Sequence, residues 1–475
     1  MAGLCAAISA AETMHMKNNA EGEILLLDAG KEPGHKILAT GNGRCNLTNR
    51  RQDAAFYRTG DQGADFLFHP DGWDLEMTDF MESLGILLHE RDGYVYPRCD
   101  QAAAVREALL RRIQKENVTV LRECRVREIR REASGGYQVF WSRGKENCSS
   151  PADAVILSTG GMVSGACHCM GDGYRLAREL GHHVTEPVPA LCALSTDDPN
   201  RKIAAGVRTA CAVRLLIDGR KAAEDCGEIQ MTADGISGIP VFQISRFAAR
   251  SLKDTPEKEI TAVLDFLPEL SEEEWKREKK RRLLQMSEQD TLGDFCLGLV
   301  PDKIASYLIA DLSEVRERKI SNLKDRSIPE KLLDRMRNKT VRITGTADFE
   351  KAQVTAGGIP LSEITEEMES RFAKGLYLAG ELLDVDGCCG GYNLTWAMHS
   401  GRLAGRKAVR NRNRNWGTEM IEISQIKLPC GSDPSLLEGK IRKLLRLSRE
   451  EHFRFELSHH SVDARKKPVL YDVYS

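Results

Sequence analysis

Three short apolar runs stand out along the chain, and each of them passes into a glycine-containing turn. They are GEILLLDAG at 22–30, ADAVILSTGG at 152–161 and GLYLAG at 375–380. Uninterrupted apolar runs of this length are typical of strands that are buried on both faces of a parallel sheet. Small residues at 2–16 and at 390–408 predict helices that pack closely on such a sheet. The pattern therefore predicts an α/β fold.

The segment that follows the first predicted strand contains a helix and then an alternating region. Residues 101–115 show a helical period, with the expected buried face made of Ala102, Ala103, Val105, Leu109 and Leu110. Residues 118–142 alternate between apolar and polar positions, which is typical of a hairpin or a β-meander. Both elements are expected to belong to the same domain as the parallel strands.

A different texture begins near residue 187. Short strand-like runs separated by proline and glycine turns predict a small β-domain, and residues 270–338 are strongly charged with a helical period. Strand-like alternation returns at 341–359. The basic run KREKKRR at 276–282 has two interpretations, a nucleic-acid patch or a solvated helix face, and the balanced charge of the chain favours the second.

The composition of the chain argues against several classes of function. The net charge is −2 and 29% of the residues are charged, so no global field attracts nucleic acid or an anionic membrane. No apolar run approaches the ~20 residues of a membrane-spanning helix, and the N-terminus lacks the pattern of a signal peptide. The 14 cysteines have no repeated spacing. We therefore expect a cytoplasmic protein with reduced thiols and with neither membrane nor nucleic-acid partners.

The first 28 residues contain part of a dinucleotide-binding pattern. Such a fold places Gly-x-Gly-x-x-Gly between a strand and a helix, and an acidic residue at the end of the next strand. Gly3 fits the third glycine and Asp28 fits the acid that binds a ribose hydroxyl, although their separation is longer than usual. An alanine-rich packing helix is an equal alternative on these residues alone.

Two further segments carry chemistry that suits a flavin. The loop TGNGRCNLTN at 40–49 offers many backbone N–H groups and one guanidinium, which suits a phosphate or the edge of a flavin ring. The segment GGYNLTWAMHSG at 390–401 places two glycines and Asn393 at the start of a helix. The partial positive charge of that helix N-terminus would stabilise an anionic reduced flavin. We expect these two segments to meet at one ring system.

At this point the sequence resembles a known family. The stretches AGLCAA, KILATGNGRCNLTN, ILSTGG, GDGYRLARELGH, GEIQMTADGISGIPVFQIS, QVTAGGI and GLYLAGELLDVDGCCGGYNLTWAMHSG are similar to those of the bacterial FAD-dependent oxidoreductases called YhiN-like or BaiN-like. They occur in order along the chain to about residue 410. The resemblance implies a Rossmann-like FAD-binding domain of the glutathione-reductase type, interrupted by a β-barrel-like domain and a helical domain.

The resemblance also implies domain boundaries. We expect the first FAD-binding segment at 1–186, the β-barrel-like domain at 187–268 plus 339–358, the helical domain at 269–338, the second FAD-binding segment at 359–410, and a linker with a small αβ extension at 411–475. The family has a strand and a glycine-rich turn before Ala-Gly-Leu, so the first strand is missing here. We expect a start codon assigned too late rather than a natural truncation. The tail from Met420 is not part of the family pattern.

FAD is the cofactor that the resemblance implies, and its expected contacts include Val126, Glu381 and Leu394. The full set of expected cofactor-binding residues is Gly3, Asp28, Thr40, Gly41, Asn42, Gly43, Arg44, Cys45, Asn46, Val126, Thr159, Gly160, Gly161, Gly380, Glu381, Gly391, Asn393 and Leu394.

The reaction expected from the family is reduction of a conjugated C=C bond. One activity associated with the family is reduction of 3-oxo bile-acid intermediates during 7-dehydroxylation, so a steroid enone is the expected substrate. The chain has no second Gly-x-Gly-x-x-Gly on a strand–helix unit, so NAD(P)H would approach the flavin transiently, or a carrier protein would deliver electrons. The proton donor cannot be chosen from the sequence; the candidates are Tyr392, Arg44, His399 and Tyr174.

Other motifs favour structural interpretations. Cys45 could be a redox thiol, but a small packing residue is favoured because no CxxC partner accompanies it. The adjacent Cys388 and Cys389 could form a vicinal disulfide, but two small loop residues are favoured. Cys167-His168-Cys169 lacks the second ligand pair of a zinc site, so no metal is expected. Two other function classes remain open, a flavoprotein that modifies RNA and a non-catalytic or electron-transfer flavoprotein.

Overall fold

The computed structural model describes residues 1–16, 22–60, 68–133, 135–163, 170–412, 426–429, 436–445, 460–463 and 471–474. The chain divides into two compact units, Met1–Asn413 and Arg414–Ser475. In the second unit, β21 (Ile426–Pro429), β23 (Tyr471–Tyr474) and β22 (His460–Asp463) form an antiparallel sheet in that order, with α11 (Leu436–Leu445) beside β21. Ile426, Leu428, Leu437 and Ile441 form its buried apolar cluster.

The apolar runs become two parallel strand pairs in the first unit. β1 (Leu25–Leu27) pairs with β6 (Thr119–Leu121), and β10 (Val155–Leu157) pairs with β19 (Leu376–Leu378). None of the described strands joins the two pairs, so they are separate in the sheet topology. The parallel pairing agrees with the α/β fold class expected from the uninterrupted apolar runs.

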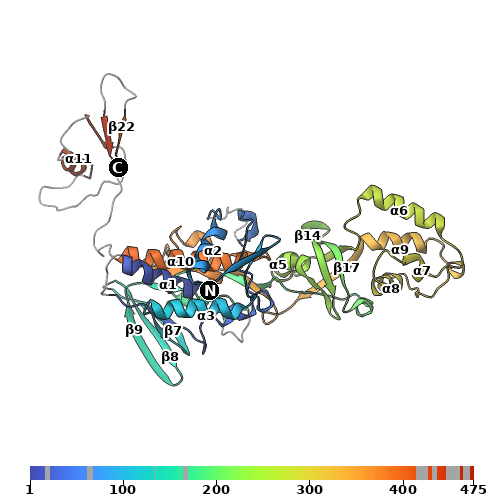
Figure 1. Cartoon of the computed structure of the whole chain (residues 1–475), viewed down its shortest axis with the longest axis horizontal. Helices are drawn as coiled ribbons and strands as arrows, with labels where there is room; N and C mark the ends of the chain where they lie inside the picture. Colours follow the sequence, from blue (N-terminus) through green and yellow to red (C-terminus); the bar gives the residue numbers. More distant parts are fainter. Residues whose placement is uncertain are drawn as a thin grey trace. The chain divides into compact units, whose positions relative to one another are not determined.

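Two long helices lie side by side along this domain (Figure 1). They are α1 (Ala2–Met16) and α10 (Tyr392–Arg412). Glycines make the close packing possible, because a Cβ built on Gly401 would lie 2.3 Å from the carbonyl oxygen of Ala2, and one built on Gly405 would lie 2.2 Å from that of Ala6. The small residues at 2–16 therefore allow α1, which is buried on most of its surface, to pack closely against α10.

α3 (Ala102–Lys115) corrects one detail of the predicted helix face. Its buried side chains are Ala102, Val105, Leu109 and Ile113. Ala103 is exposed. The helix turns about 100° per residue, so Ala103 lies a quarter-turn beyond the stripe that begins at Ala102 and continues through Ile113.

Smaller sheets surround the parallel pairs. β7 (Cys124–Arg131), β8 (Tyr137–Arg143) and β9 (Glu146–Ala152) form an antiparallel meander, which Figure 1 shows as neighbouring strands. The hairpin or meander expected at 118–142 is thus found from β7 onward, whereas its first residues form β6 and pair in parallel with β1. A second sheet has the order β2 (Thr48–Asn49), β5 (Tyr94–Pro97) and β4 (Leu88–Arg91). The remaining pairs are β3 (Tyr57–Arg58) with β20 (Asp386–Gly387), and β11 (Thr185–Ala190) with β18 (Val354–Gly358). The helices of this part include α2 (Trp73–Ser83) and α4 (Asp172–Glu179).

The β-domain is a closed six-stranded barrel. Its strand order is β12 (Leu194–Thr196), β15 (Gly235–Gly238), β14 (Arg220–Met231), β13 (Arg208–Ile217), β16 (Ile260–Asp265) and β17 (Lys339–Thr346). The barrel is shorter than the predicted β-domain, because β11 and β18 pair with each other outside it. α5 (Ile239–Asp254) follows β15 and packs against β14 and β11.

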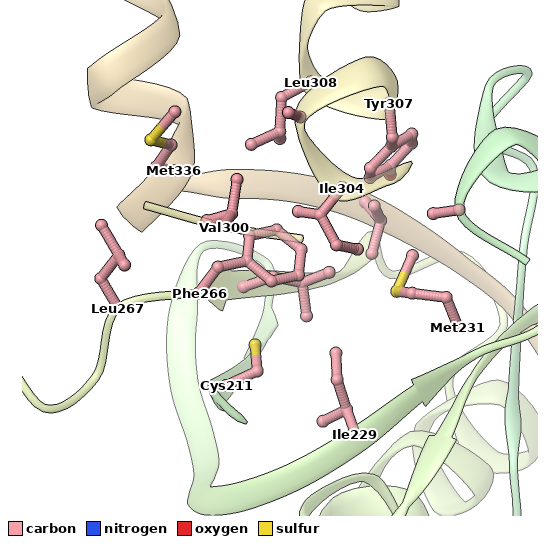
Figure 2. Close-up of a cluster of buried hydrophobic side chains, with 14 of the residues drawn as sticks. Cys211, Ile229, Met231, Phe266, Leu267, Val300, Ile304, Tyr307, Leu308 and Met336 are labelled. Carbon is pink, nitrogen blue, oxygen red and sulfur yellow. The ribbon is translucent and has the colours of Figure 1, made fainter. Parts of the chain in front are cut away.

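The helical insertion lies between β16 and β17. Its helices are α6 (Glu272–Gln285), α7 (Leu292–Cys296), α8 (Asp302–Ala310) and α9 (Ile328–Arg337). Figure 2 shows Phe266, Ile304 and Met336 in one cluster with barrel residues such as Ile229 and Met231, and all five side chains are buried. Barrel and helices therefore share one core. Among the described helices, none combines the length and the apolar character that a membrane crossing requires.

Candidate functional site

The first unit contains a cavity of about 2050 Å³ between the parallel strand pairs, the 40–46 loop, the N-terminus of α10 and the edge of the barrel. Pockets for a drug-sized ligand measure roughly 300–1,000 Å³. This volume therefore accommodates a dinucleotide-sized cofactor together with a second small molecule.

The two segments that were expected to share a ring system meet at this cavity. The 40–46 loop leads directly into β2, and a Cβ built on Gly391 would lie 2.7 Å from the Cα of Thr48. The hydroxyl of Thr395 lies 2.8 Å from that of Thr48 and donates a hydrogen bond to it. Backbone contact and a buried hydrogen bond thus hold the start of α10 against the end of the loop.

The 40–46 loop is a compact turn with several residues in the left-handed region. Gly41, Asn42, Gly43 and Cys45 have φ values of 56°, 55°, 82° and 61°. The Cys45 N–H donates to the Thr40 carbonyl at 3.0 Å, which closes the turn. Thr40, Gly41, Asn42, Arg44 and Asn46 line the cavity, whereas Gly43 and Cys45 lie outside its described lining.

Two residues of this loop have contrasting side-chain environments. Cys45 is fully buried in the core beside α1, and burial raises the pKa of its thiol to about 11. This environment fits the packing role favoured from the sequence. The Oδ1 atom of Asn46 is buried and accepts no hydrogen bond from the described residues, although the residue lines the cavity. A buried acceptor without a donor is costly, so Asn46 is suited to a ligand that donates a hydrogen bond.

The N-terminus of α10 faces the same space. Gly391, Asn393 and Leu394 line the cavity. The Asn393 side chain accepts a hydrogen bond from the Gly387 N–H at 2.8 Å and donates one to the Gly387 carbonyl at 2.9 Å. Its amide therefore fixes the glycine-rich loop in place, and the helix presents its backbone N–H groups and partial positive charge toward the cavity.

The residues expected near the nucleotide belong to the same cavity. Gly3, Asp28, Val126, Thr159 and Gly160 all line it. Asp28 follows β1, and its Oδ1 accepts a hydrogen bond from the Gly30 N–H at 2.7 Å. The arrangement agrees with an acid at the end of the second strand of a dinucleotide fold.

Glu381 also lines the cavity. Its carboxylate pairs with Lys36 and accepts a hydrogen bond from the Thr355 N–H at 2.8 Å. Gly161 and Gly380 lie outside the described lining, because Gly161 packs against Thr355 and Gly380 against Ala2. The cofactor contacts expected from the sequence remain predictions, and the structure brings most of them to one cavity.

The four candidate proton donors do not share one environment. Arg44 lines the cavity, with its guanidinium 5.8 Å from the centre of the Tyr96 ring. Tyr392 is buried, and its hydroxyl donates to the Arg51 carbonyl at 3.0 Å. His399 lies 2.6 Å from Glu76 and stacks on Trp73.

Tyr174 is also buried, 3.5 Å from the Glu381 carbonyl. Tyr392, His399 and Tyr174 are not among the residues that line the cavity. The hydroxyl groups of Tyr392 and Tyr174 and the ring of His399 each have a partner from a distant part of the chain, and their roles remain predictions.

Two tyrosines that sequence reasoning did not single out do line the cavity, Tyr94 and Tyr96 on β5. The alternation in DGYVYP was the available signal, because it places both rings on one face while Val95 and Pro97 are buried on the other. The adjacent Cys388 and Cys389 also line the cavity and are both free thiols. Among the described residues, no group of three or more metal-ligating side chains is found, and Cys167–Cys169 lie outside the described residues.

Comparison with known proteins assigns the chain to a protein family. The family model described as HI0933-like protein Rossmann domain matches residues 1–407. The chain belongs to this family. It is 41% identical over 410 residues to the 3-dehydro-bile acid delta(4,6)-reductase of Clostridium scindens, covering 86% of this chain and 96% of that relative. The expected family and α/β fold class are confirmed, and the chain is a Rossmann-type oxidoreductase.

Two less similar relatives act on ribosomal RNA according to their names. The chain is 27% identical over 387 residues to the ribosomal RNA dihydrouridine synthase of Escherichia coli, and 28% identical over 391 residues to that of Haemophilus influenzae. Each match covers 79% of this chain and 90% of the relative. The tail at 420–474 matches a separate model, a domain of unknown function.

Proposed function

We propose that this protein uses FAD to reduce a conjugated C=C bond of a 3-oxo steroid of the bile-acid type, with NAD(P)H as the electron donor and in the cytoplasm. The observation that carries the proposal is the 41% identity to a bile-acid delta(4,6)-reductase over 96% of that enzyme. The cavity supports it, because residues from both expected flavin-binding segments and from the barrel line one continuous space.

The residues present fit FAD. The buried Oδ1 of Asn46 can accept a hydrogen bond from the cofactor. The N-terminus of α10 carries partial positive charge that would stabilise the electron-rich edge of a flavin. The carboxylate of Asp28 can accept a hydrogen bond from a ribose hydroxyl group. When bound, FAD supplies the hydride. The protein's own residues orient it and exclude water: Asn393 fixes the loop beside it, and Glu381 is held by Lys36 and Thr355.

The barrel side of the cavity suits an apolar substrate. Leu191, Ile239 and Phe242 line it, and Ile239 is 55% exposed although it is apolar. Ile239 and Phe242 belong to α5, which joins the barrel to the glycine-rich loop through Gln243, whose side-chain oxygen accepts from the Cys389 N–H at 3.0 Å. A steroid ring system lying between α5 and the cofactor would cover this apolar surface.

The RNA-modification alternative rests on the two ribosomal RNA dihydrouridine synthases, which are less similar to this chain than the bile-acid enzyme is. The basic run on α6 gives it little support. Lys279 lies 2.6 Å from Asp334, and Arg281 and Arg282 both pair with Glu278. Side chains that are paired in this way are typical of a solvated helix face and not of a nucleic-acid binding patch. RNA binding with a steep salt dependence would favour the alternative.

The proposed reaction is tested anaerobically. The purified protein is expected to show the visible absorption of bound FAD, to bleach with NADH or NADPH, and to regain its colour when a 3-oxo-4,6-diene steroid is added. A colourless protein that takes up no added FAD would contradict the cofactor assignment. Bleaching only with a chemical reductant would move the electron donor to a carrier protein and leave the steroid step standing.

Replacing Asn46 with leucine should weaken FAD binding about tenfold, because one hydrogen bond of about 1.5 kcal/mol is lost. The dissociation constant can be measured by quenching of free FAD fluorescence. Cys45→Ala is the matched control, since Cys45 is the adjacent residue in sequence but lies outside the described lining. Equal weakening by both substitutions would show that loop stability, and not the Asn46 oxygen, determines binding.

A further inference from the structure

We propose that Tyr94 is the catalytic acid of this site and gives the substrate the proton that completes reduction of the C=C bond. This inference rests on the proposed function and adds the residue that the reaction still lacks. Three of the four donors considered from the sequence are not among the residues that line the cavity, so the side chains that do line it are the better candidates for the acid.

The sheet around β5 places Tyr94 where the two flavin-binding segments meet. Asn49 of β2 is its strand partner, and β2 directly follows the 40–46 loop. A Cβ built on Gly390 would lie 3.1 Å from Cε1 of Tyr94, so the ring lies against the backbone just before α10 begins. Tyr94 and the Gly390–Gly391 segment line the same cavity. A phenol at this position is within the part of the site where a substrate would face the cofactor.

The hydroxyl group of Tyr94 is available for a ligand. It forms no hydrogen bond within the described part of the chain, whereas the hydroxyl groups of Tyr57 and Tyr392 donate to Gln52 and to the Arg51 carbonyl. Burial raises the pKa of Tyr94, and the nearby Cys389 and Tyr96 act in the same direction. The phenol is therefore protonated at neutral pH, which is the state that a proton donor needs.

Tyr96 is a close comparison on the same strand. It lies two residues further along and lines the same cavity. The centre of its ring, however, is 5.8 Å from the Arg44 guanidinium and 5.8 Å from the centre of the His89 ring. Tyr94 instead lies against Gly390. We therefore assign the proton transfer to Tyr94.

Reduction of the enone requires one hydride and one proton. The π bond of the enone breaks, one carbon receives a hydride, and its neighbour on the carbonyl side receives the proton from the Tyr94 O–H. The substrate gains two electrons, which NAD(P)H has supplied through the cofactor. The phenolate that remains takes a proton from water, so Tyr94 is restored for the next turnover.

The test compares Tyr94→Phe with Tyr96→Phe in the full chain loaded with FAD. The reduced enzyme is mixed anaerobically with a 3-oxo-4-ene or 3-oxo-4,6-diene steroid, and return of the visible absorption is followed by stopped flow. Tyr94→Phe is expected to slow this step by about 10²–10⁴-fold. Tyr96→Phe should change it less than tenfold. For both variants we expect unchanged absorption of bound FAD, unchanged reoxidation by ferricyanide, and an unchanged steroid dissociation constant measured by perturbation of that absorption.

A second readout separates chemistry from structure. With the 3-oxo-4,6-diene in D₂O, the wild-type product should carry deuterium on one face of the carbon beside the one that received the hydride, because one fixed acid delivers it. The residual product of Tyr94→Phe should carry it on both faces, because solvent reaches the carbon from either side. A single-face product from Tyr94→Phe would contradict the proposal.

The experiments test the proposed function and the role of Tyr94 separately. If no enone reoxidises the wild-type protein, the proposed function is wrong. If enones reoxidise the wild type and Tyr94→Phe equally well, the function stands and Tyr94 is not the acid. Should Tyr94→Phe fail to fold, 3-fluorotyrosine at position 94 keeps the hydroxyl group and lowers its pKa. The pH at which reoxidation declines is then expected to move down, and an unmoved profile would overturn the assignment.

Discussion

Replacing Gly391 with alanine is expected to lower the free energy of unfolding of the first unit by about 3 kcal/mol, compared with about 1 kcal/mol for alanine at Gly85. Both glycines have φ in the left-handed region, 93° at Gly391 and 85° at Gly85. They differ in their surroundings, because the Gly391 Cβ would lie 2.7 Å from the backbone of Thr48, whereas Gly85 has nothing within 4 Å. The difference between the variants therefore measures the close contact alone.

The contact at Gly391 involves backbone atoms, which cannot rotate away as a flexible side chain could. Relief requires β2 and α10 to separate, and this would stretch the hydrogen bond between Thr395 and Thr48. Because the same contact joins the two segments that we propose to hold the flavin, we also expect Gly391→Ala to retain less FAD than Gly85→Ala. The measurement is a urea unfolding curve for each variant. Equal midpoints would show that the two segments are not held together at Gly391.

The parts of the site that could be predicted from the sequence are those with a local physical cause. The apolar runs at 22–30 and 152–161 led to β1 and β10, and the glycine- and asparagine-rich loop led to a turn that lines the cavity. In each case the residues that determine the conformation are close together along the chain. Tertiary contacts refine such elements without replacing them.

The proton donor could not be predicted, because its environment depends on residues far away in the sequence. Tyr392 and His399 have suitable chemistry, but Arg51 and Glu76 satisfy them from more than 300 positions away. The alternation around Tyr94 was visible, and the sequence nonetheless leaves open which face of β5 meets the cavity. That face is fixed by pairing with β2, and by the contact with Gly390. Local pattern therefore predicts an element, whereas its function depends on the partner strand.

A buried ion pair between α5 and β20 is expected to make the stability of the protein depend on pH. Arg246 lies 3.0 Å from Asp386, and their side chains are 9% and 0% exposed. Burial raises the pKa of Asp386 to about 6, while Arg246 and Arg58 lower it, and Asp384 raises it. Burial outweighs the attraction of the guanidinium groups. Neither carboxylate oxygen of Asp386 accepts a well-directed hydrogen bond from the described residues, which is consistent with that balance.

The sign of the pH dependence follows from this raised pKa. The folded-state value of about 6 lies above the ordinary value of 3.8, so the folded protein holds the proton more tightly than the unfolded chain. Stability from this group is complete below pH ~4 and is lost as the pH rises through about 6. We expect the free energy of unfolding to fall by about 2–3 kcal/mol across this window relative to Asp386→Asn, which lacks the titrating group.

Replacing Arg246 with methionine should be far more costly at pH 8 than at pH 5. At pH 8 the buried carboxylate of Asp386 loses its neighbouring guanidinium, which typically costs about 3–5 kcal/mol. At pH 5 that carboxylate binds a proton and most of the cost disappears. Adding Asp386→Asn should therefore rescue Arg246→Met at pH 8. Arg208→Met is the control: its pair with Glu228 is 64% and 62% exposed, so we expect a cost below about 1 kcal/mol at either pH. A pH-independent loss in Arg246→Met would mean that Arg246 stabilises α5 by packing rather than by its charge.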